Sequence, residues 1–223
     1  MKRAVIFVNG NLSDLSQAKK IITKEDFLVA ADGGVKHVLK LGLIPQTIIG
    51  DFDSISTSLR KKLEKSKIEW IKYPKKKDKT DFELALDYCL EKKFNEIIIF
   101  GILGDRVDHF IANIFLLAKI QTENKSIKIK IVEGKKEIYI LDKEIVINGQ
   151  IGDEVSIIPV SEKLEGVVTE GLEYQLNNEL LSFGSTKGIS NVLNKTLAKI
   201  TVKQGVALVV HKNKYSSTLT IKP

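Results

Sequence analysis

Two aspartates separated by one residue, Asp51 and Asp53, are the side chains in this sequence best suited to hold a metal ion. On an extended backbone, side chains two residues apart leave the same side of the chain, so the two carboxylates are expected to lie close together. They repel each other, and a divalent cation relieves the repulsion. Mg²⁺ fits, because it takes one or two carboxylates and completes its shell with water and phosphate oxygens. The structural alternative is an Asx turn at Asp51 with Asp53 capping the next helix.

Further aspartates follow other runs that read as strands, which would bring them to one edge of a sheet. Turn formation alone would explain one or two such positions, but not all of them. These aspartates are Asp32 after Phe27–Ala31, Asp51 and Asp53 after Thr47–Ile49, Asp78 and Asp81 after Glu69–Tyr73, and Asp105 and Asp108 after Glu96–Phe100.

Glycines and cations stand beside these acids. Gly33 and Gly34 either let a phosphate approach the backbone or form a simple tight turn. Arg106 is one of only three arginines, and a guanidinium in a glycine loop can clamp phosphate. Asp105 reads equally well as a helix N-cap. His109 either contacts a nucleotide or caps the site.

Several common catalytic signatures are absent from the sequence. There is no GxxxxGK[ST] segment and no protein-kinase signature set, and neither GxSxG nor HExxH occurs. The remaining interpretation is a Mg²⁺–phosphate site assembled from aspartates.

In order and spacing, these motifs resemble those of thiamine pyrophosphokinases over essentially the whole chain. The matching segments are ADGG (Ala31–Gly34), GDFDS (Gly50–Ser54), DKTDFELAL (Asp78–Leu86), GILGDRVDH with Asn113 following, and GSTKGISN (Gly184–Asn191).

The resemblance implies transfer of a pyrophosphoryl group from ATP to the hydroxyl of thiamine, giving thiamine diphosphate and AMP. It implies Mg²⁺ held by Asp51, Asp53 and Asp81, and a homodimer whose active sites combine the first domain of one subunit with the second domain of its partner. The implied ATP-binding residues are Asp32, Gly33, Gly34, Asp78, Lys79, Thr80, Asp105, Arg106, His109 and Asn113, and the implied thiamine-binding residues are Ser185, Ser190 and Asn191.

Positioning and charge neutralisation supply most of the rate enhancement in phosphoryl chemistry. Besides the metal-binding aspartates, Arg106 and Lys79 are expected to balance developing charge, and either Asp81 or Asp108 to accept the hydroxyl proton. Some relatives stack the thiamine ring on a tryptophan of the second domain. The only tryptophan here, Trp70, belongs to the first domain, so Phe183 and Tyr174 are left as candidate platforms.

The elements that must position these residues change in kind along the chain. Short β-branched runs alternate with helical patterns over the first 120 residues, as in Asp81–Glu91 with its single apolar stripe, and this alternation is typical of a mostly parallel, doubly wound, Rossmann-like sheet. From about Ser126 the pattern becomes apolar–polar alternation broken by Gly, Asn and Asp turns, which favours a smaller all-β sandwich. We therefore expect a catalytic ATP- and Mg²⁺-binding domain over residues 1–135 and a thiamine-binding domain over 136–223.

The charge is concentrated in one segment. Ten cations and three acids lie between Arg60 and Lys79, which accounts for the whole net charge of +7. Scarce arginine argues against a nucleic-acid binder. We expect Lys75–Lys77 to act as a distant electrostatic funnel for ATP, with Lys79 as the direct contact.

The remaining features predict a cytoplasmic enzyme. Cys89 is the only cysteine, which excludes an intramolecular disulfide, and its apolar helical neighbours favour a core position. The N-terminal apolar run is too short for a signal peptide, and no run approaches the roughly 20 residues of a membrane span. Another Mg²⁺-dependent pyrophosphotransferase or a nucleotide hydrolase is the alternative enzyme.

Overall fold

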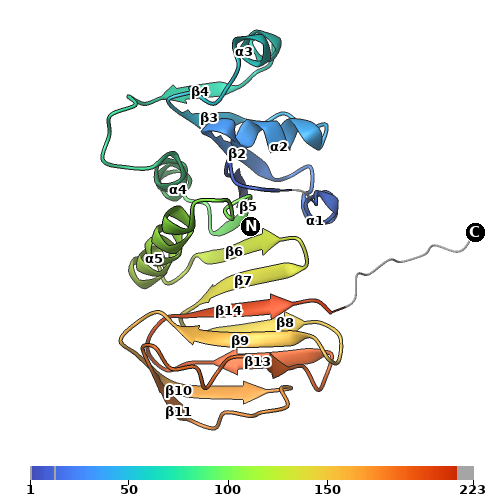
Figure 1. Cartoon of the computed structure of the whole chain (residues 1–223), viewed down its shortest axis with the longest axis vertical. Helices are drawn as coiled ribbons and strands as arrows, with labels where there is room; N and C mark the ends of the chain where they lie inside the picture. Colours follow the sequence, from blue (N-terminus) through green and yellow to red (C-terminus); the bar gives the residue numbers. More distant parts are fainter. Residues whose placement is uncertain (1, 13, 215–223) are drawn as a thin grey trace, which may run out of the picture. The chain divides into compact units, whose positions relative to one another are not determined.

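A computed structural model describes residues 2–12 and 14–214 of the 223-residue chain (Figure 1). The chain divides into two compact units. Unit 1 consists of Met1–Ile120 and Ser126–Gly134, and unit 2 of Gln121–Lys125 and Lys135–Pro223. Unit 1 has the α/β character expected of the N-terminal part, and unit 2 is built from antiparallel strands.

Among the residues that the structure describes, unit 1 contains six parallel strands in the order β6-β5-β1-β2-β3-β4. The strands are β1 Arg3–Phe7, β2 Phe27–Ala31, β3 Thr47–Gly50, β4 Glu69–Lys72, β5 Glu96–Phe100 and β6 Lys128–Glu133. Between them lie α1 Ser16–Ile21, the 3₁₀ turn η1 Asp32–Gly34, α2 Val35–Lys40, α3 Thr57–Leu63, α4 Asp81–Glu91 and α5 Val107–Glu123.

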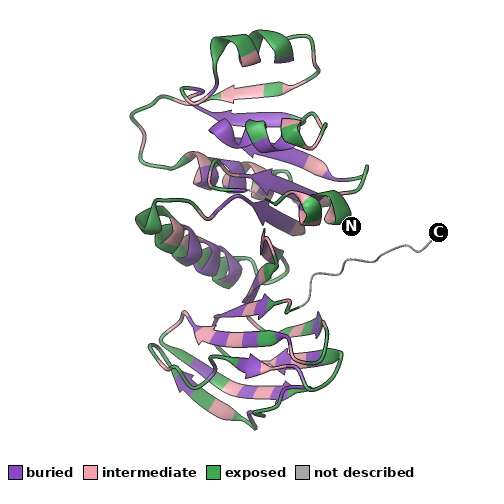
Figure 2. Cartoon of the chain, turned by 45° about the vertical axis from the view of Figure 1, so that its right-hand side comes forward, coloured by how far each residue is buried: buried purple, intermediate pink, exposed green. Residues whose placement is uncertain are grey.

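The central strands of unit 1 are buried along almost their whole length (Figure 2). On β1, Val5 and Phe7 pack in a cluster with residues of α1 and α2, including Ala18 and Val38. Helix α4 packs on β1, β2 and β3 with the apolar stripe that the sequence predicts. Continuous apolar strands of this kind form only where both faces are covered.

The boundaries of the helices depend on local caps. Thr80 Oγ1 accepts a hydrogen bond from the Glu83 N–H and starts α4, and Ser56 Oγ accepts one from the Leu59 N–H and starts α3. Helix α5 begins at Val107, so Asp105 lies one residue outside the cap position that the sequence suggested for it.

Up to Lys214, where the described part of unit 2 ends, eight strands pair antiparallel in the orders β12-β9-β14-β7 and β11-β10-β13-β8. Both groups contribute to one buried apolar cluster that includes Ile157, Val209, Leu164 and Ile200. The strands are β7 Lys136–Leu141, β8 Glu144–Asn148, β9 Glu154–Pro159, β10 Lys163–Glu170, β11 Glu179–Ser182, β12 Asn191–Val192, β13 Leu197–Thr201 and β14 Ala207–Lys212.

One side chain behaves as the sequence suggests. Cys89 is fully buried on α4, and burial raises the pKa of its thiol to about 12. It therefore remains a protonated core side chain at ordinary pH. None of the described helices combines the length and apolar character that a membrane crossing requires.

The turn between β2 and α2 packs unusually close to β1. A Cβ added to Gly34 would lie 2.0 Å from the Phe7 carbonyl oxygen, and one added to Gly33 would lie 2.3 Å from Asn9 Oδ1. The two glycines are needed for this packing, which agrees with the tight turn that was one of the two alternatives for them. The contact fixes Asp32, which opens the same turn.

We expect Gly34→Ala to lower the free energy of unfolding by about 2–3 kcal/mol, because the methyl group would clash with backbone that cannot move aside. Gly42→Ala is the control, since that site has open space and a left-handed φ of 75°. The control should lose about 1 kcal/mol from backbone strain alone. Urea unfolding compares the two, and a Gly34→Ala variant as stable as Gly42→Ala would contradict the packing argument.

Candidate functional site

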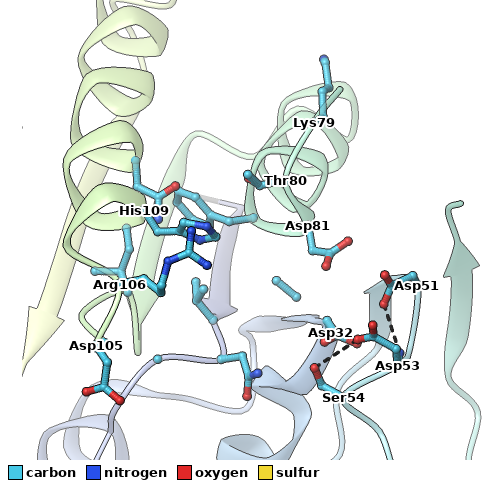
Figure 3. Close-up of a pocket in the computed structure, with 18 of the residues that line it drawn as sticks. Asp32, Asp51, Asp53, Ser54, Lys79, Thr80, Asp81, Asp105, Arg106 and His109 are labelled. Atoms are coloured by element: carbon cyan, nitrogen blue, oxygen red, sulfur yellow. Dashed lines mark hydrogen bonds between the residues drawn. The ribbon is translucent and has the colours of Figure 1, made fainter. Parts of the chain in front are cut away.

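A pocket of about 1110 Å³ opens in unit 1 at the carboxyl ends of the parallel strands (Figure 3). Acidic, basic and amide side chains all line it, as expected where strand ends of an α/β sheet meet. The lining residues are Val8, Asn9, Gly10, Asn11, Ala31, Asp32, Asp51, Asp53, Ser54, Lys75, Lys77, Lys79, Thr80, Asp81, Phe82, Ile102, Gly104, Asp105, Arg106, His109 and Asn113.

Three carboxylates converge at one end of this pocket. One oxygen from each of Asp32, Asp51 and Asp53 lies within 4.8 Å of the others. Asp32 is buried, and its Oδ1 has no hydrogen-bond partner among the described residues. A buried carboxylate oxygen without a donor is costly, and a bound cation would satisfy it. This group therefore suits a hard divalent ion such as Mg²⁺.

The Asp51–Asp53 pair forms for a different reason from the one predicted. Strand β3 ends at Gly50, and Phe52 has a left-handed φ of 68°, so the segment is not extended. Instead, Asp51 Oδ1 accepts a hydrogen bond of 3.0 Å from the Asp53 N–H, which makes an Asx turn. The buried Phe52 ring anchors this turn against Trp70, edge-on at 5.2 Å between ring centroids. The Asx turn proposed as a structural alternative is thus part of the acidic group, while Ser56 and not Asp53 caps the next helix.

Gly50 brings Asp81 up to the same group. Its φ is 150°, and an added Cβ would lie 3.0 Å from Asp32 Cβ and 3.1 Å from Asp81 Cγ. Burial raises the pKa of the Asp81 carboxyl, the nearby Lys77 ammonium opposes the rise, and the charges of Asp32 and Asp51 add to it. Asp81 is therefore a fourth carboxylate that shares the electrostatic field of the other three.

The lysine loop, which carries Lys75–Lys77 between β4 and α4, contacts the acidic group directly and is not only the distant electrostatic funnel that the sequence predicts. Lys75 Nζ lies 2.7 Å from Asp53 Oδ2, and this contact lowers the pKa of Asp53. Lys77 Nζ lies 2.8 Å from Asp81 Oδ1. Lys79, expected as the direct phosphate contact, lines the pocket but pairs with Asp87 at 2.6 Å and points away from the acidic group (Figure 3). The two lysines with direct contacts to the acids are thus Lys75 and Lys77.

The opposite wall comes from the start of α5. His109 and Asn113 lie one turn apart on this helix and both face the pocket. Arg106 forms a two-pronged ion pair with Asp108, with Nε–Oδ1 at 2.9 Å and Nη2–Oδ2 at 2.5 Å. This pair lowers the pKa of Asp108 to about 2, which makes its carboxylate a poor proton acceptor at neutral pH.

Ten of the expected phosphate-side residues line the pocket and four do not. Those outside the lining are Gly33, Gly34, Asp78 and Asp108, and those within it are Asp32, Asp51, Asp53, Lys79, Thr80, Asp81, Asp105, Arg106, His109 and Asn113.

The residues after β1 contribute to the pocket although the sequence analysis did not single them out. Asn9, Gly10 and Asn11 line its floor, and buried His37 holds the loop through a 2.9 Å contact between its Nε2 and the Gly10 carbonyl. The signal was present in the sequence as an Asn-Gly-Asn segment at the end of the first strand. It lacks a charge, which is why a search for ionisable groups passes over it.

The expected thiamine-side residues lie in unit 2. The buried Asn191 side chain accepts from the Tyr174 N–H at 3.0 Å and donates to the Tyr174 carbonyl at 2.6 Å. Ser190 has a left-handed φ of 59°, and its N–H donates to Ser156 Oγ. Ser185 is half-buried, while the rings of Tyr174 and Phe183 are exposed. Asn191 thus fixes the backbone that carries an exposed aromatic ring.

Comparison with known proteins agrees with this arrangement. The family model described as "Thiamin pyrophosphokinase, catalytic domain" matches residues 18–131, and "Thiamin pyrophosphokinase, vitamin B1 binding domain" matches residues 142–207. The thiamine pyrophosphokinase of Bacillus subtilis is 35% identical over 189 residues, which cover 82% of this chain and 85% of that protein. The thiamin pyrophosphokinase 1 of Caenorhabditis elegans is 27% identical over 92% of this chain and 86% of that protein.

Solved structures give the same result. The crystal structure of thiamine pyrophosphokinase from Bacillus subtilis superposes with a TM-score of 0.85 at 31% identity, covering 96% of this chain and all of that one. The thiamin pyrophosphokinase from Geobacillus thermodenitrificans gives a TM-score of 0.80 at 28% identity, covering 98% of this chain and 99% of that one.

The Arg106–Asp108 pair can be tested by titration. We expect the Asp108 carboxyl to titrate near pH 2, and Arg106→Met to return its pKa toward the ordinary 3.8 because the partner charge is gone. Arg106→Lys keeps the charge but loses the two-pronged geometry, so its effect should be intermediate. NMR of the carboxyl carbon measures the Asp108 pKa in all three proteins. A pKa that is the same in all three would show that the pair does not form in solution.

Proposed function

The chain belongs to the thiamin pyrophosphokinase family, and from this we propose that it is an enzyme that transfers a pyrophosphoryl group from ATP to the hydroxyl of thiamine. The products would be thiamine diphosphate and AMP. The observation that carries the proposal is the pocket of unit 1, where four carboxylates and several cations meet within the segment matched by the family's catalytic domain. Such a pocket can hold a metal–polyphosphate complex.

We propose that Mg²⁺ is held by Asp51, Asp53 and Asp81, with Asp32 completing the group. The support is the close approach of the Asp32, Asp51 and Asp53 oxygens and the partnerless buried oxygen of Asp32. When bound, the ion would supply positive charge that neutralises phosphate oxygens. Mg²⁺ dehydrates reluctantly and keeps several waters, so it needs only part of this carboxylate set directly.

The nucleotide would lie between the acidic group and the start of α5. Arg106 is placed to clamp phosphate once it leaves Asp108, since both side chains are exposed and free to exchange partners. His109 and Asn113 present donors from one face of α5, and Thr80 lines the pocket at the start of α4. Asp32, Gly33 and Gly34 contribute by shaping the turn beneath the phosphates, and Asp78, Lys79 and Asp105 lie at the periphery.

The thiamine hydroxyl must attack the β-phosphorus in line, with AMP leaving on the opposite side. Of the two candidate proton acceptors, we propose Asp81. Asp81 lines the pocket, and burial raises the pKa of its carboxyl, whereas Asp108 does not line the pocket. To accept the proton, this carboxylate must lie within hydrogen-bond distance of the attacking thiamine hydroxyl.

The finer description of the two units follows the same proposal. We assign residues 1–135 as a Rossmann-like, doubly wound catalytic domain and residues 136–223 as a β-sandwich that binds thiamine through Ser185, Ser190 and Asn191. The burial of both faces of β1 supports the first assignment, and the shared core of the two strand groups supports the second. Because Asn191 fixes the backbone of Tyr174, the exposed Tyr174 ring is our preferred platform for the thiamine ring.

We further propose a cytoplasmic homodimer with active sites between subunits. Its support is the family resemblance together with an exposed apolar row on α5, where Val107, Ile111 and Phe115 lie beside the pocket-lining His109 and Asn113. A row of apolar side chains at helical spacing next to a binding site suits a subunit contact.

The proposed reaction is tested by product analysis. With ATP, Mg²⁺ and thiamine we expect AMP and thiamine diphosphate in equal amounts, and no AMP release when thiamine is omitted. AMP with free pyrophosphate would instead indicate a nucleotide hydrolase. AMP release that requires a hydroxymethylpterin rather than thiamine would indicate a different pyrophosphotransferase.

Removal of the acidic pair should abolish turnover. We expect Asp51→Asn and Asp53→Asn each to lower kcat by about three orders of magnitude, because the metal would lose a charged ligand. Asp14→Asn is the matched control, since Asp14 lies outside the pocket and an asparagine oxygen can still accept the hydrogen bond from the Ser16 N–H. Near-normal Mg²⁺-dependent turnover in both site variants would contradict the metal assignment.

A further inference from the structure

In the lysine loop between β4 and α4, two of three consecutive lysines contact the acidic group and the middle one does not. Lys75 and Lys77 contact Asp53 and Asp81, at 2.7 and 2.8 Å. Lys76 between them is exposed and forms no ion pair with any residue that the structure describes. The ammonium groups on either side of Lys76 therefore serve as the counter-ions of the acidic group.

The two contacts are ionic and open to exchange. The Lys77 ammonium lies close to Asp81 Oδ1, but Oδ1 accepts no hydrogen bond, so the contact lacks the directed geometry of a strong pair. The Lys75 side chain is 79% exposed, and exposed ion pairs contribute little free energy. A divalent ion interacts with several carboxylates at once, and it would compete well against both lysines.

The net charge at the acidic group permits such an exchange. Two ammonium groups carry the same total charge as one divalent ion, so replacing them leaves the acidic group equally neutralised. The two lysines would then be free beside a pocket wide enough for a polyphosphate. Lys79 is not part of this arrangement, because its ammonium group contacts Asp87 on α4 and not a carboxylate of the acidic group.

We propose that Lys75 and Lys77 are exchangeable counter-ions of the metal site: a divalent ion displaces them from Asp53 and Asp81, and the released ammonium groups then bind the polyphosphate. Lys77 is the more important of the two, because its side chain is only 14% exposed and its reach is limited to the pocket. The inference rests on the proposed function, in that it takes the acidic group to be the metal site.

The test is Mn²⁺ binding to the full-length protein without nucleotide, measured by calorimetry and by the EPR signal of free Mn²⁺. Removing a competing cation should tighten Mn²⁺ binding, by about two- to fivefold in Lys75→Met and about five- to tenfold in Lys77→Met. Lys76→Met is the matched control for the loss of one positive charge, and Lys77→Arg keeps a competing cation, so both should bind Mn²⁺ as the unsubstituted protein does.

A second measurement follows the released lysines. The analogue α,β-methylene-ATP cannot be cleaved at the reacting bridge, and with Mg²⁺ it should bind about fivefold more weakly to Lys77→Met than to Lys76→Met. A merely structural role for Lys77 would weaken metal and analogue together, whereas exchange predicts opposite changes. Thermal unfolding of each variant verifies that it is folded.

The outcomes separate the two proposals. Mn²⁺ binding that is unchanged or weaker in both Lys75→Met and Lys77→Met, while the unsubstituted protein binds, overturns the exchange and leaves the proposed metal site standing. Tighter Mn²⁺ binding with unchanged analogue binding overturns the transfer of Lys77 to the polyphosphate. If the unsubstituted protein binds no Mn²⁺, the metal site itself fails, and the exchange fails with it.

Discussion

The mutual repulsion of four carboxylates is the constraint on which this site depends. Asp32, Asp51, Asp53 and Asp81 come from three different connections of the sheet, and no local turn could hold them together against their charge. The fold supplies the opposing free energy through buried strands beneath them. Part of that stability is spent on strained backbone, at Asp32 with a φ of 44° and at Phe52 with a φ of 68°.

The strain is held in place by specific packing. The buried Phe52 ring packs against Trp70, and Arg60 Cζ lies 5.7 Å from the Phe52 ring centroid and 5.6 Å from the Trp70 ring centroid. Gly34 packs against the Phe7 carbonyl and fixes the turn that presents Asp32. The packing of unit 1 and the geometry of the acidic group therefore depend on each other. Loosening the Phe52–Trp70 contact or the Gly34–Phe7 contact would let the carboxylates move apart.

The excess positive charge of the chain is concentrated next to the acidic group. The positive segment that accounts for the net charge of +7 includes Lys75 and Lys77, which neutralise part of the acidic group, and Arg60, which covers the aromatic support. Opposite charges side by side in one pocket suit a ligand that is itself a metal cation on a polyanion. This explains how a basic protein can have an aspartate-rich site.

The sequence by itself determined which residues reach the edge of the sheet. Asp32, Asp51 and Asp53 closely follow strand-forming runs, and Asp81 opens the helix that follows the next run, so the order of elements places all four at the edge where the parallel strands end. The change from helical to alternating patterns likewise predicts the antiparallel second part, and spacing alone predicts the start of α4.

Only the tertiary structure decided which partner each side chain takes. Asp108 pairs with Arg106 and leaves the pocket lining, Lys79 turns to Asp87, and the uncharged Asn9 enters the floor of the pocket. The physical reason is that ion pairing depends on distances of a few ångströms between side chains brought together by packing, whereas sequence periodicity specifies only the face and the end of an element.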